Sequence, residues 1–323
     1  MNISFLKKYQ PQFFSEFEID QEYINILKTL INIDNLNILI IGDIGSGKTS
    51  LLLAIIKEYY STVKNKQLIN ENIMHINNLK EQGIQYYRNE VKIFCQTKSS
   101  IQNKKKIIMI DDFDYINEQS QQVFRNCMDK YSHNVLFLAS CTNAQKIIDS
   151  IQSRMTLIKL KAFTNAQLYQ IIDDICISEQ ITIEPNAKKF IIAVCNHSVK
   201  ILLNYMEKFT LLDENITLDI AEAVCTNISF REFEKYTILC KDKNNLPEAI
   251  SKMHSLIKLG YSVMDILDCY FLFIKNTDII TENKKYNIIA LICKYITVFH
   301  NIHEDDIELS FFTNNLINML SND

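Results

Sequence analysis

The stretch Gly42-Asp43-Ile44-Gly45-Ser46-Gly47-Lys48-Thr49 decides the fold of this chain, because it matches the spacing G-x-x-x-x-G-K-[ST]. Glycine lets backbone N–H groups curl around phosphate oxygens without a Cβ in the way, and three of the chain's five glycines fall in this stretch. A lysine here can reach the outer phosphates of a nucleotide, and a threonine hydroxyl can ligate Mg²⁺. The stretch therefore predicts a phosphate-binding loop for ATP with Mg²⁺.

The residues on either side support this interpretation over a chance match at a turn. Residues 37–41 predict a buried strand before the loop, and residues 51–56 predict a helix that begins near Ser50. The N-terminus of a helix carries partial positive charge and favours an anion. The residues assigned to ATP binding are Gly42, Asp43, Ile44, Gly45, Ser46, Gly47, Lys48, Thr49 and Ser50.

A second acidic segment follows another apolar run. Residues 107–110 predict a buried strand, and Asp111, Asp112 and Asp114 come after it. A carboxylate at the carboxyl end of a parallel strand beside the phosphate loop is where an acid linked to Mg²⁺ belongs. We therefore assign Mg²⁺ to Thr49 and Asp111, with a strand-capping aspartate as the alternative for Asp111. Asp114 is expected to be a solvated surface charge.

Short apolar runs alternate with helical patterns over residues 1–161, which predicts an α/β core. Runs of four or five apolar residues bounded by polar clusters suit a parallel sheet covered by helices on both faces. They lie at residues 37–41, 73–76, 107–110, 135–139 and 157–160. Beyond residue 161 only helical patterns follow, so we expect three parts: a core over 1–161, a small helical unit over 162–224 and a larger one over 225–323.

Composition narrows the class of protein. The chain has 323 residues, 47% of them apolar, which is enough for two or three packed cores. Its net charge of −4 means that any nucleic-acid contact must be a local basic strip or be shared with other subunits. Nine cysteines without a C-x-x-C pair, and six histidines without metal spacing, disfavour a disulfide framework and a zinc site. With no signal peptide and no membrane-spanning run, we expect a soluble intracellular protein, in the nucleus or the cytoplasm.

Four further stretches narrow the class of ATP-binding protein to which the chain is expected to be similar. Leu6-Lys7-Lys8-Tyr9-Gln10-Pro11 opens the chain, Gln82-Gly83-Ile84 precedes Arg88, and Gln121-Gln122-Val123-Phe124-Arg125 follows the acidic strand. The most specific is Lys146-Ile147-Ile148-Asp149-Ser150-Ile151-Gln152-Ser153-Arg154. In this order they resemble E-K-Y-R-P, R-G-I-x-x-x-R, Q-Q-A-L-R and K-I-I-x-x-I-Q-S-R-C of replication factor C small subunits, which are AAA+ clamp loaders. Met155 replaces the final cysteine, and residues 303–309 resemble the family's collar region more weakly.

The resemblance implies roles for single residues. Arg154 matches the arginine finger that a subunit offers to its neighbour's ATP, a role that suits a guanidinium because it is always charged and bonds phosphate bidentately. Sensor 1, normally an asparagine, falls on Thr142 or Asn143, and sensor 2, normally an arginine, falls on Lys200. Asp112 stands where AAA+ ATPases usually carry the glutamate that orients the attacking water. Its shorter side chain could slow hydrolysis while leaving binding intact.

The resemblance also implies partners. Arg88 and Arg125 match basic positions that face the DNA backbone in clamp loaders, with an ordinary surface arginine as the alternative for each. Residues 104–106, three lysines, are interpreted as a solvated loop instead. The implied fold is an α/β P-loop NTPase (AAA+) core with a parallel sheet, a helical lid over 162–224 and an all-helical collar over 225–323. The implied partners are the other subunits of a hetero-pentamer, a PCNA-type sliding clamp and primer–template DNA, with no membrane.

Four interpretations stay open. The first is a working ATPase subunit of a clamp loader, and the second is a scaffold subunit that binds nucleotide but hardly hydrolyses it. Asp112, Lys200 and the ambiguous sensor 1 favour the scaffold, whereas Lys48, Thr49 and Asp111 oppose it. The third is another AAA+ DNA-remodelling ATPase, such as a branch-migration motor, and the fourth is a small-molecule kinase, which the extra helical parts disfavour.

Overall fold

The computed structural model of the chain describes residues 4–17, 21–76, 84–212, 214–226, 228–299, 303 and 305–320. Backbone contacts divide the chain into two units. Unit 1 comprises Met1–Leu168 and His197–Glu207, and unit 2 comprises Tyr169–Asn196 and Lys208–Asp323. The three-part division expected from the sequence stays a prediction.

Unit 1 is built on a five-stranded parallel sheet with the strand order β2-β3-β4-β1-β5. All five runs chosen from the sequence are strands, so the expected parallel sheet is confirmed. Their bounds are β1 (Ile38–Ile41), β2 (Ile73–Ile76), β3 (Lys106–Ile110), β4 (Val135–Cys141) and β5 (Thr156–Lys159).

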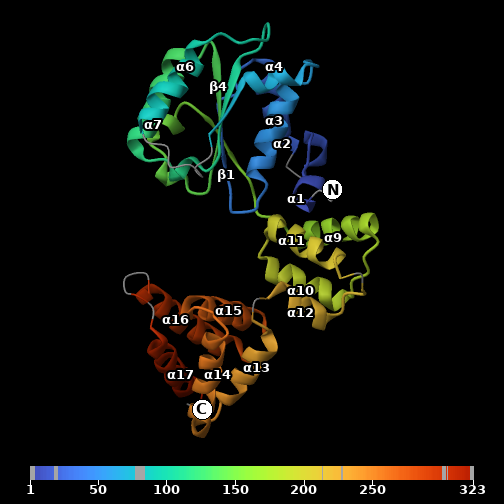
Figure 1. Cartoon of the computed structure of the whole chain (residues 1–323), viewed down its shortest axis with the longest axis vertical. Helices are drawn as coiled ribbons and strands as arrows, with labels where there is room; N and C mark the ends of the chain where they lie inside the picture. Colours follow the sequence, from blue (N-terminus) through green and yellow to red (C-terminus); the bar gives the residue numbers. More distant parts are fainter. Residues whose placement is uncertain are drawn as a thin grey trace. The chain divides into compact units, whose positions relative to one another are not determined.

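Helices cover both faces of this sheet (Figure 1). On one face α2 (Gln21–Asn32) and α3 (Lys48–Tyr59) bury apolar side chains against the strands. On the other face lie α6 (Lys92–Gln96) and α7 (Glu118–Tyr131), and Phe124 of α7 is fully buried in that core. Burial on both faces explains why the central strands β1, β3 and β4 are continuous apolar runs rather than alternating ones.

Short elements complete unit 1. Helix α7 begins after Asn117, whose side-chain oxygen accepts a hydrogen bond from the Ser120 N–H at 2.9 Å, as an N-cap does. A π-helical turn, Tyr87–Val91, joins α5 to α6. The remaining short helices are α1 (Phe5–Lys8), α4 (Lys66–Glu71), α5 (Ile84–Tyr86) and α8 (Asp149–Gln152), with 3₁₀ turns at Phe14–Glu16, Phe113–Tyr115 and Ala144–Lys146.

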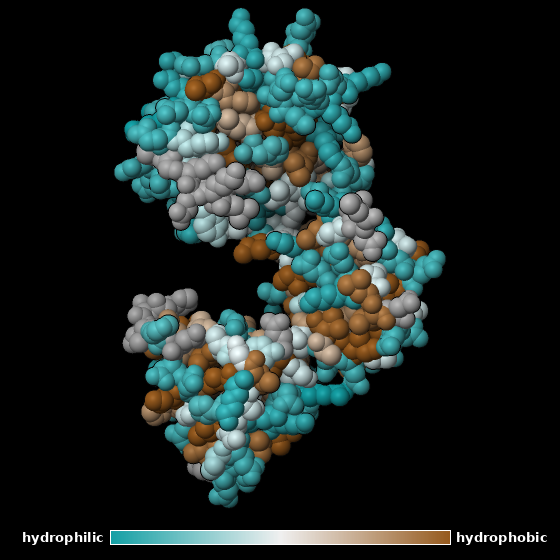
Figure 2. Space-filling view, viewed as in Figure 1, coloured by the Kyte–Doolittle hydropathy of each residue, from teal (hydrophilic) through white to brown (hydrophobic). Residues whose placement is uncertain are grey.

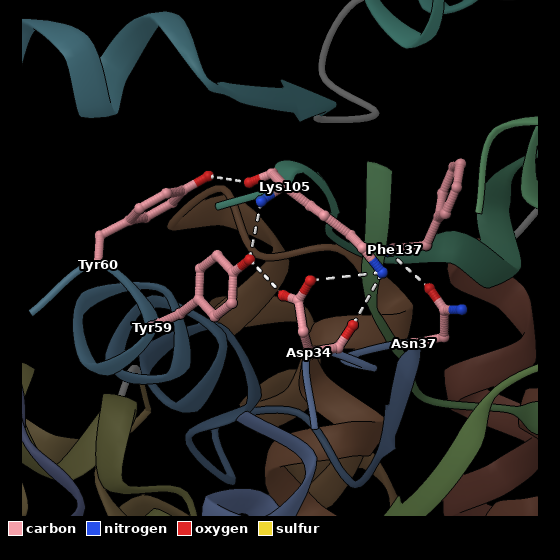
Figure 3. A network of polar contacts seen from close by, with 6 residues as sticks. All are labelled: Asp34, Asn37, Tyr59, Tyr60, Lys105 and Phe137. Atoms are coloured by element: carbon pink, nitrogen blue, oxygen red, sulfur yellow. Dashed lines mark hydrogen bonds and ion pairs between the residues drawn. The ribbon is translucent and has the colours of Figure 1, made fainter. Parts of the chain in front are cut away.

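A polar network anchors the C-terminal end of α3 to the amino edge of the sheet (Figure 3). The Tyr59 hydroxyl donates to Asp34 Oδ1 at 2.5 Å and accepts from the Lys105 N–H at 2.9 Å. The Tyr60 hydroxyl donates to the Lys105 carbonyl at 2.7 Å, and Lys105 Nζ lies 3.5 Å from Asp34 Oδ2. Because α3 starts directly after the phosphate loop, the network fixes the helix at the end opposite that loop.

The loop expected for the lysines at 104–106 holds for Lys104 and Lys105, which precede β3 and are partly exposed, but not for Lys106. Lys106 is the first residue of β3 and is buried, with its ammonium donating to the Phe94 carbonyl at 3.3 Å and to Thr97 Oγ1. Lys105 belongs to the network with Asp34. Both ammonium groups find oxygen acceptors that a run of three lysines alone does not reveal.

In the part of unit 2 that the structure describes, the regular elements are helices, apart from one isolated bridge between Ile183 and Ile216. Helix α14 starts with Pro247 in its first turn, and Gly260, at φ 97°, lies just past its end, as expected from the sequence. Helices α9 and α11 each cross from one unit into the other. The bounds are α9 (Asn165–Glu179), α10 (Pro185–Cys195), α11 (Val199–Thr210), α12 (Leu218–Cys225), α13 (Phe230–Leu239), the 3₁₀ turn Lys243–Asn245, α14 (Leu246–Lys258), α15 (Val263–Asn276), α16 (Glu282–Phe299) and α17 (Asp306–Leu320).

A large core holds helices α13 to α17 of unit 2 together. Tyr270 is fully buried and its hydroxyl lies 3.1 Å from Thr237 Oγ1, while Tyr236, also buried, lies 3.0 Å from Thr313 Oγ1. These pairings satisfy the hydroxyls of two buried tyrosines. Among the residues that the structure describes, no helix is both long and apolar enough to cross a membrane.

Candidate nucleotide-binding site

The phosphate loop joins the carboxyl end of β1 to α3. Helix α3 begins at Lys48, two residues earlier than expected, and its N-cap Gly47 supplies no side chain to bond the first N–H groups. Lys48 is buried, and its Nζ donates to the carbonyls of Gly42 and Asp43, each at 2.9 Å. The loop therefore presents a lysine ammonium and uncapped helix N–H groups, the chemistry that binds phosphate.

Ser198, which directly precedes α11, lies against this loop within unit 1. Gly45 has φ +81°, and a Cβ on it would lie 2.0 Å from Ser198 Oγ and 3.3 Å from Ser198 Cα. Gly47 has φ +88° but would meet nothing within 4 Å. Glycine is thus required at both positions for its backbone, and at Gly45 also for space.

We expect Gly45→Ala to destabilise unit 1 more than Gly47→Ala. Both substitutions force an L-residue into the left-handed region, which costs about 1–2 kcal/mol, and only Gly45→Ala adds the collision with Ser198. Chemical denaturation of the two variants measures the difference, and adding Ser198→Ala should recover part of it. Equal losses for the two glycines would show that Ser198 does not press on the loop.

An acidic group stands beside the loop at the carboxyl end of β3. Thr49 Oγ1 donates to Asp111 Oδ2 at 2.8 Å, and Ser140 Oγ donates to Asp111 Oδ1. Ser140 also accepts from the Asp112 N–H at 3.1 Å. Ile110 of β3 pairs with Ala139 of β4, so the sheet register places Ser140 level with Asp111. Thr49 and Asp111 are together, as the Mg²⁺ prediction requires.

Asp112 lies next to this group in an unusual backbone conformation. Its φ and ψ are both 53°, in the left-handed region, which aspartate tolerates better than most residues. Burial and the neighbouring Asp111 charge raise the pKa of Asp112, while Lys48 and Lys200 oppose that rise. Lys200, on α11, is therefore close enough to act on the same carboxylate.

Asp114 is not the solvated charge expected from the sequence. It is 7% exposed, and its Oδ2 accepts hydrogen bonds from Thr142 Oγ1 at 2.5 Å, Thr142 N at 3.3 Å and Asn143 N at 3.1 Å. Although burial alone would raise the pKa of Asp114, these hydrogen bonds lower it. Asp114 thus holds in place both residues that were considered for sensor 1.

We expect Asp114→Asn to lower the free energy of unfolding by about 1–3 kcal/mol near neutral pH, because hydrogen bonds to a buried charge are lost. The folded pKa lies below the ordinary value of 3.8, so the wild-type advantage is present above that pH. It is lost as the pH falls through the folded pKa. Urea unfolding of both proteins between pH 3 and pH 7 measures this, and a difference independent of pH would contradict it.

The residues around the loop fit ATP with Mg²⁺. Ser46 Oγ and Ser198 Oγ are buried beside the loop without a hydrogen-bond partner. A hydroxyl and a carboxylate, Thr49 and Asp111, offer the oxygen ligands that Mg²⁺ prefers. Gln10, from the opening motif, donates from Nε2 to Ser50 Oγ at 3.3 Å, so this segment lies against the first turn of α3.

The stretch that ends in Arg154 is held tightly to α7. Gln121, fully buried on α7, donates to the carbonyls of Ile116 and Lys146 and accepts from the Ile148 N–H at 2.9 Å. Gln152 Nε2 donates to the carbonyls of Ala144 at 2.9 Å and Ile147 at 2.7 Å. Gln121 and Gln152 thus satisfy backbone carbonyls of the turn at Ala144–Lys146 and of the residues Ile116 and Ile147.

Arg154 itself forms an ion pair within its own chain. Its Nε lies 2.6 Å from Asp129 Oδ1 and its Nη2 lies 3.2 Å from Asp129 Oδ2. Arg125, one turn earlier on α7, lies 3.9 Å from the same carboxylate. Arg154, the candidate arginine finger, and Arg125, a candidate for DNA contact, therefore lie beside the carboxylate of the same residue, Asp129.

Arg88 and Arg125 lie on adjoining helices. Arg88 is exposed on the π-helical turn, and its neighbour Tyr87 contacts Phe124, the neighbour of Arg125, with 5.3 Å between ring centroids. Gln82 and Gly83 of the same motif lie outside the described residues. The two arginines therefore lie on elements that pack together, as contact with one DNA backbone would require. Their role stays a prediction.

Four residues of the site were missed from the sequence. Ser140 and Ser198 lie in the stretches considered for sensor 1 and sensor 2 but were given no role of their own. Asp129 was given no role either, and Asp114 was placed at the surface. Ser140 could have been found from the strand order and register, because it lies near the carboxyl end of β4 at the level of Asp111. The others depend on tertiary contacts that spacing does not show.

Comparison with known proteins agrees with this geometry. Residues 38–163 match the family model described as ATPase family associated with various cellular activities (AAA). A replication factor C small subunit of Methanococcus maripaludis (strain C7) is 28% identical over 293 residues, which cover 90% of this chain and 91% of the relative.

Two solved structures from Thermotoga maritima share the fold. A protein related to the DNA polymerase III gamma subunit aligns over 91% of this chain and 99% of its own, with a TM-score of 0.55 and 13% identity. The RuvB Holliday junction branch migration motor aligns over 87% and 98%, with a TM-score of 0.54 and 14% identity. The chain therefore contains an AAA domain over residues 38–163 and is similar along most of its length to replication factor C small subunits.

Proposed function

We propose that the chain is a subunit of a clamp loader that uses ATP binding and hydrolysis to place a PCNA-type sliding clamp on primed DNA. The observation that carries the proposal is the extent of the similarity to replication factor C small subunits. It covers 90% of the chain, so it includes helical unit 2 as well as the AAA match at residues 38–163.

In this proposal the loop residues 42–50 hold ATP, and Thr49 with Asp111 hold Mg²⁺. Bound ATP supplies a γ-phosphoryl group whose transfer to water is the reaction of the site. Asp112 orients the attacking water, Lys200 contributes positive charge, and Thr142 or Asn143 serves as sensor 1. Arg154 reaches the ATP of a neighbouring subunit.

Surface residues of each unit support the proposed partners. Arg88 and Arg125 contact the DNA backbone, which positions a duplex without reading its sequence. Unit 2 exposes large apolar side chains, and Figure 2 shows hydrophobic residues at its surface. We assign them to contacts with the other subunits of a hetero-pentamer, because apolar surface is what assembly buries. They include Ile177, Leu211, Leu259, Tyr286 and Phe311.

Two alternatives have specific observations behind them. A scaffold subunit with little hydrolysis is favoured by Asp112, which is one methylene shorter than glutamate. Another AAA+ DNA-remodelling ATPase is allowed by the fold, since the branch migration motor aligns as well as the polymerase-related protein. The sequence relatives named replication factor C favour the clamp loader.

ATPase activity of the chain co-purified with its partner subunits tests the proposal. We expect the clamp and primed DNA together to stimulate turnover, and Lys48→Ala to reduce the stimulated rate. Stimulation that Lys48→Ala leaves unchanged would assign this chain to a scaffold position. A complex that does not respond to clamp or DNA would favour another AAA+ role.

A further inference from the structure

Asp129 is an acidic residue on α7 that none of the proposed roles uses. It lies near the C-terminal end of the helix, and its side chain is 48% exposed. Its two oxygens accept from two different nitrogens of Arg154, Nε at 2.6 Å and Nη2 at 3.2 Å. This is a bidentate, side-on pairing, which fixes the plane of a guanidinium as well as its position.

The pairing leaves a defined edge of Arg154 available. A guanidinium has five N–H donors: one on Nε and two on each Nη. Asp129 takes the Nε–H and one N–H of Nη2, and the Ser150 carbonyl takes one N–H of Nη1 at 2.5 Å. One N–H remains on each Nη, and these two neighbouring nitrogens form the end-on edge that binds two oxygens of one phosphate.

The backbone on both sides of the pair is fixed. Arg154 N–H donates to the Ile151 carbonyl at 2.9 Å, and the Ile151 and Met155 side chains are buried in the core that Phe124 of α7 also enters. The two side chains themselves are partly exposed, Arg154 to 37% and Asp129 to 48%, so their mutual contact decides where the guanidinium lies. Without a partner, a long exposed side chain would sample several rotamers.

The pair is poorly suited to stabilising the fold. An ion pair this exposed contributes little to the free energy of unfolding, because water and salt screen it. Its bidentate geometry is better explained by the orientation that it gives to the guanidinium. Arg154 and Arg125 lower the pKa of Asp129, so the carboxylate keeps its charge at neutral pH.

We infer that Asp129 is a positioning residue for Arg154: it holds the guanidinium side-on so that the end-on edge faces a phosphate brought by a neighbouring subunit. The inference rests on the proposed function for the neighbour's phosphate, and on the structure for the pairing. Arg125, the candidate for DNA contact on α7, lies 3.9 Å from the same carboxylate, so both arginines share Asp129.

A measurement on the full chain alone tests the pairing. The Arg154 Nε–H signal in ¹H–¹⁵N NMR is assigned by its loss in Arg154→Ala, and its exchange with water is followed in each variant. We expect slow exchange in the wild type, exchange at least about tenfold faster in Asp129→Ala, and recovery in Asp129→Glu. Glu118→Ala, which removes an exposed acid from the same helix, should leave the exchange unchanged.

A double-mutant comparison in the assembled complex tests the function. Asp129→Ala should lower the stimulated kcat by up to about 100-fold, as misplacement of a phosphate-binding group does, with KM for ATP less affected. Asp129→Glu should restore most of it. In an Arg154→Ala background Asp129→Ala should cause no further loss, because it acts through that arginine.

Three outcomes of these experiments would contradict the role of Asp129. If Nε–H exchange is the same in Asp129→Ala as in the wild type, the pairing does not hold Arg154. If Asp129→Ala lowers kcat as much without Arg154, the aspartate acts by another route. If Arg154→Ala does not change turnover, the finger assignment in the proposed function is wrong and Asp129 positions no phosphate contact, even where slow exchange confirms the pair.

Discussion

Asp112→Asn should lower the stimulated ATP turnover of the assembled complex by about 100-fold or more, with little change in ATP affinity. A residue that orients and deprotonates the attacking water contributes about 10²–10⁴ to the rate, whereas binding depends on the loop and on Lys48. Asparagine keeps the size of the side chain and also tolerates the left-handed backbone at φ 53°. Rate and affinity are measured by steady-state turnover and by titration with a fluorescent ATP analogue.

The raised pKa of Asp112 also predicts how turnover and thermal stability depend on its charge. Burial and Asp111 raise the folded pKa above the ordinary value of 3.8, so turnover should decline as the pH falls through that raised pKa. The same shift means that the charge destabilises the folded state at neutral pH, so Asp112→Asn should unfold at an equal or higher temperature than the wild type.

The matched control for Asp112→Asn is Glu118→Gln, an acid-to-amide change at an exposed position of α7. Its turnover should equal that of the wild type. Unchanged turnover in Asp112→Asn itself would identify a scaffold subunit, whose nucleotide is bound but hardly hydrolysed. A loss of ATP affinity equal to the loss of rate would show instead that Asp112 belongs to the binding site.

Arg154→Ala should lower the stimulated turnover of the complex by on the order of 10³-fold, the scale of an arginine that reaches a phosphate from another chain. The isolated chain should hydrolyse ATP poorly with or without the substitution, because its own site lacks the finger that a neighbour supplies. The measurement is the turnover of both variants, alone and assembled, at saturating ATP.

Arg231→Ala is the control for Arg154→Ala, since Arg231 is an exposed arginine of unit 2 that pairs with Asp219. It should leave turnover within a few-fold of the wild type. Rapid hydrolysis by the isolated wild-type chain, unaffected by Arg154→Ala, would contradict the trans assignment.

The core of unit 1 could be predicted from the sequence because its signals are local. A phosphate loop needs glycine at positive φ, and strands buried on both faces are continuous apolar runs, so both are visible in a few consecutive residues. The same holds for α14, where Pro247 and Gly260 mark the two ends.

The rest of the site could not be predicted because its signals are tertiary. Asp114 follows the strand like any surface acid, and only the fold brings the Thr142 and Asn143 N–H groups onto it. Ser198 lies more than 150 residues after Gly45 in the chain, yet it is so close to Gly45 that a Cβ there would collide with its hydroxyl. From the sequence, Asp129 is predicted to be an ordinary acid on the surface of a helix. Only the fold, in which Arg154 lies between α8 and β5, brings the guanidinium onto its carboxylate.

The most direct test of the central claim is clamp loading itself. Fluorescent clamp is incubated with ATP, circular primed DNA and the complex that contains this chain, and the DNA is then washed with high salt. We predict that clamp stays on circular DNA, leaves when the circle is cut open, and is not loaded when this chain carries Lys48→Ala together with Asp112→Asn. Clamp that is never retained by the circle, with an active complex and ATP present, would contradict the claim that the chain serves a clamp loader.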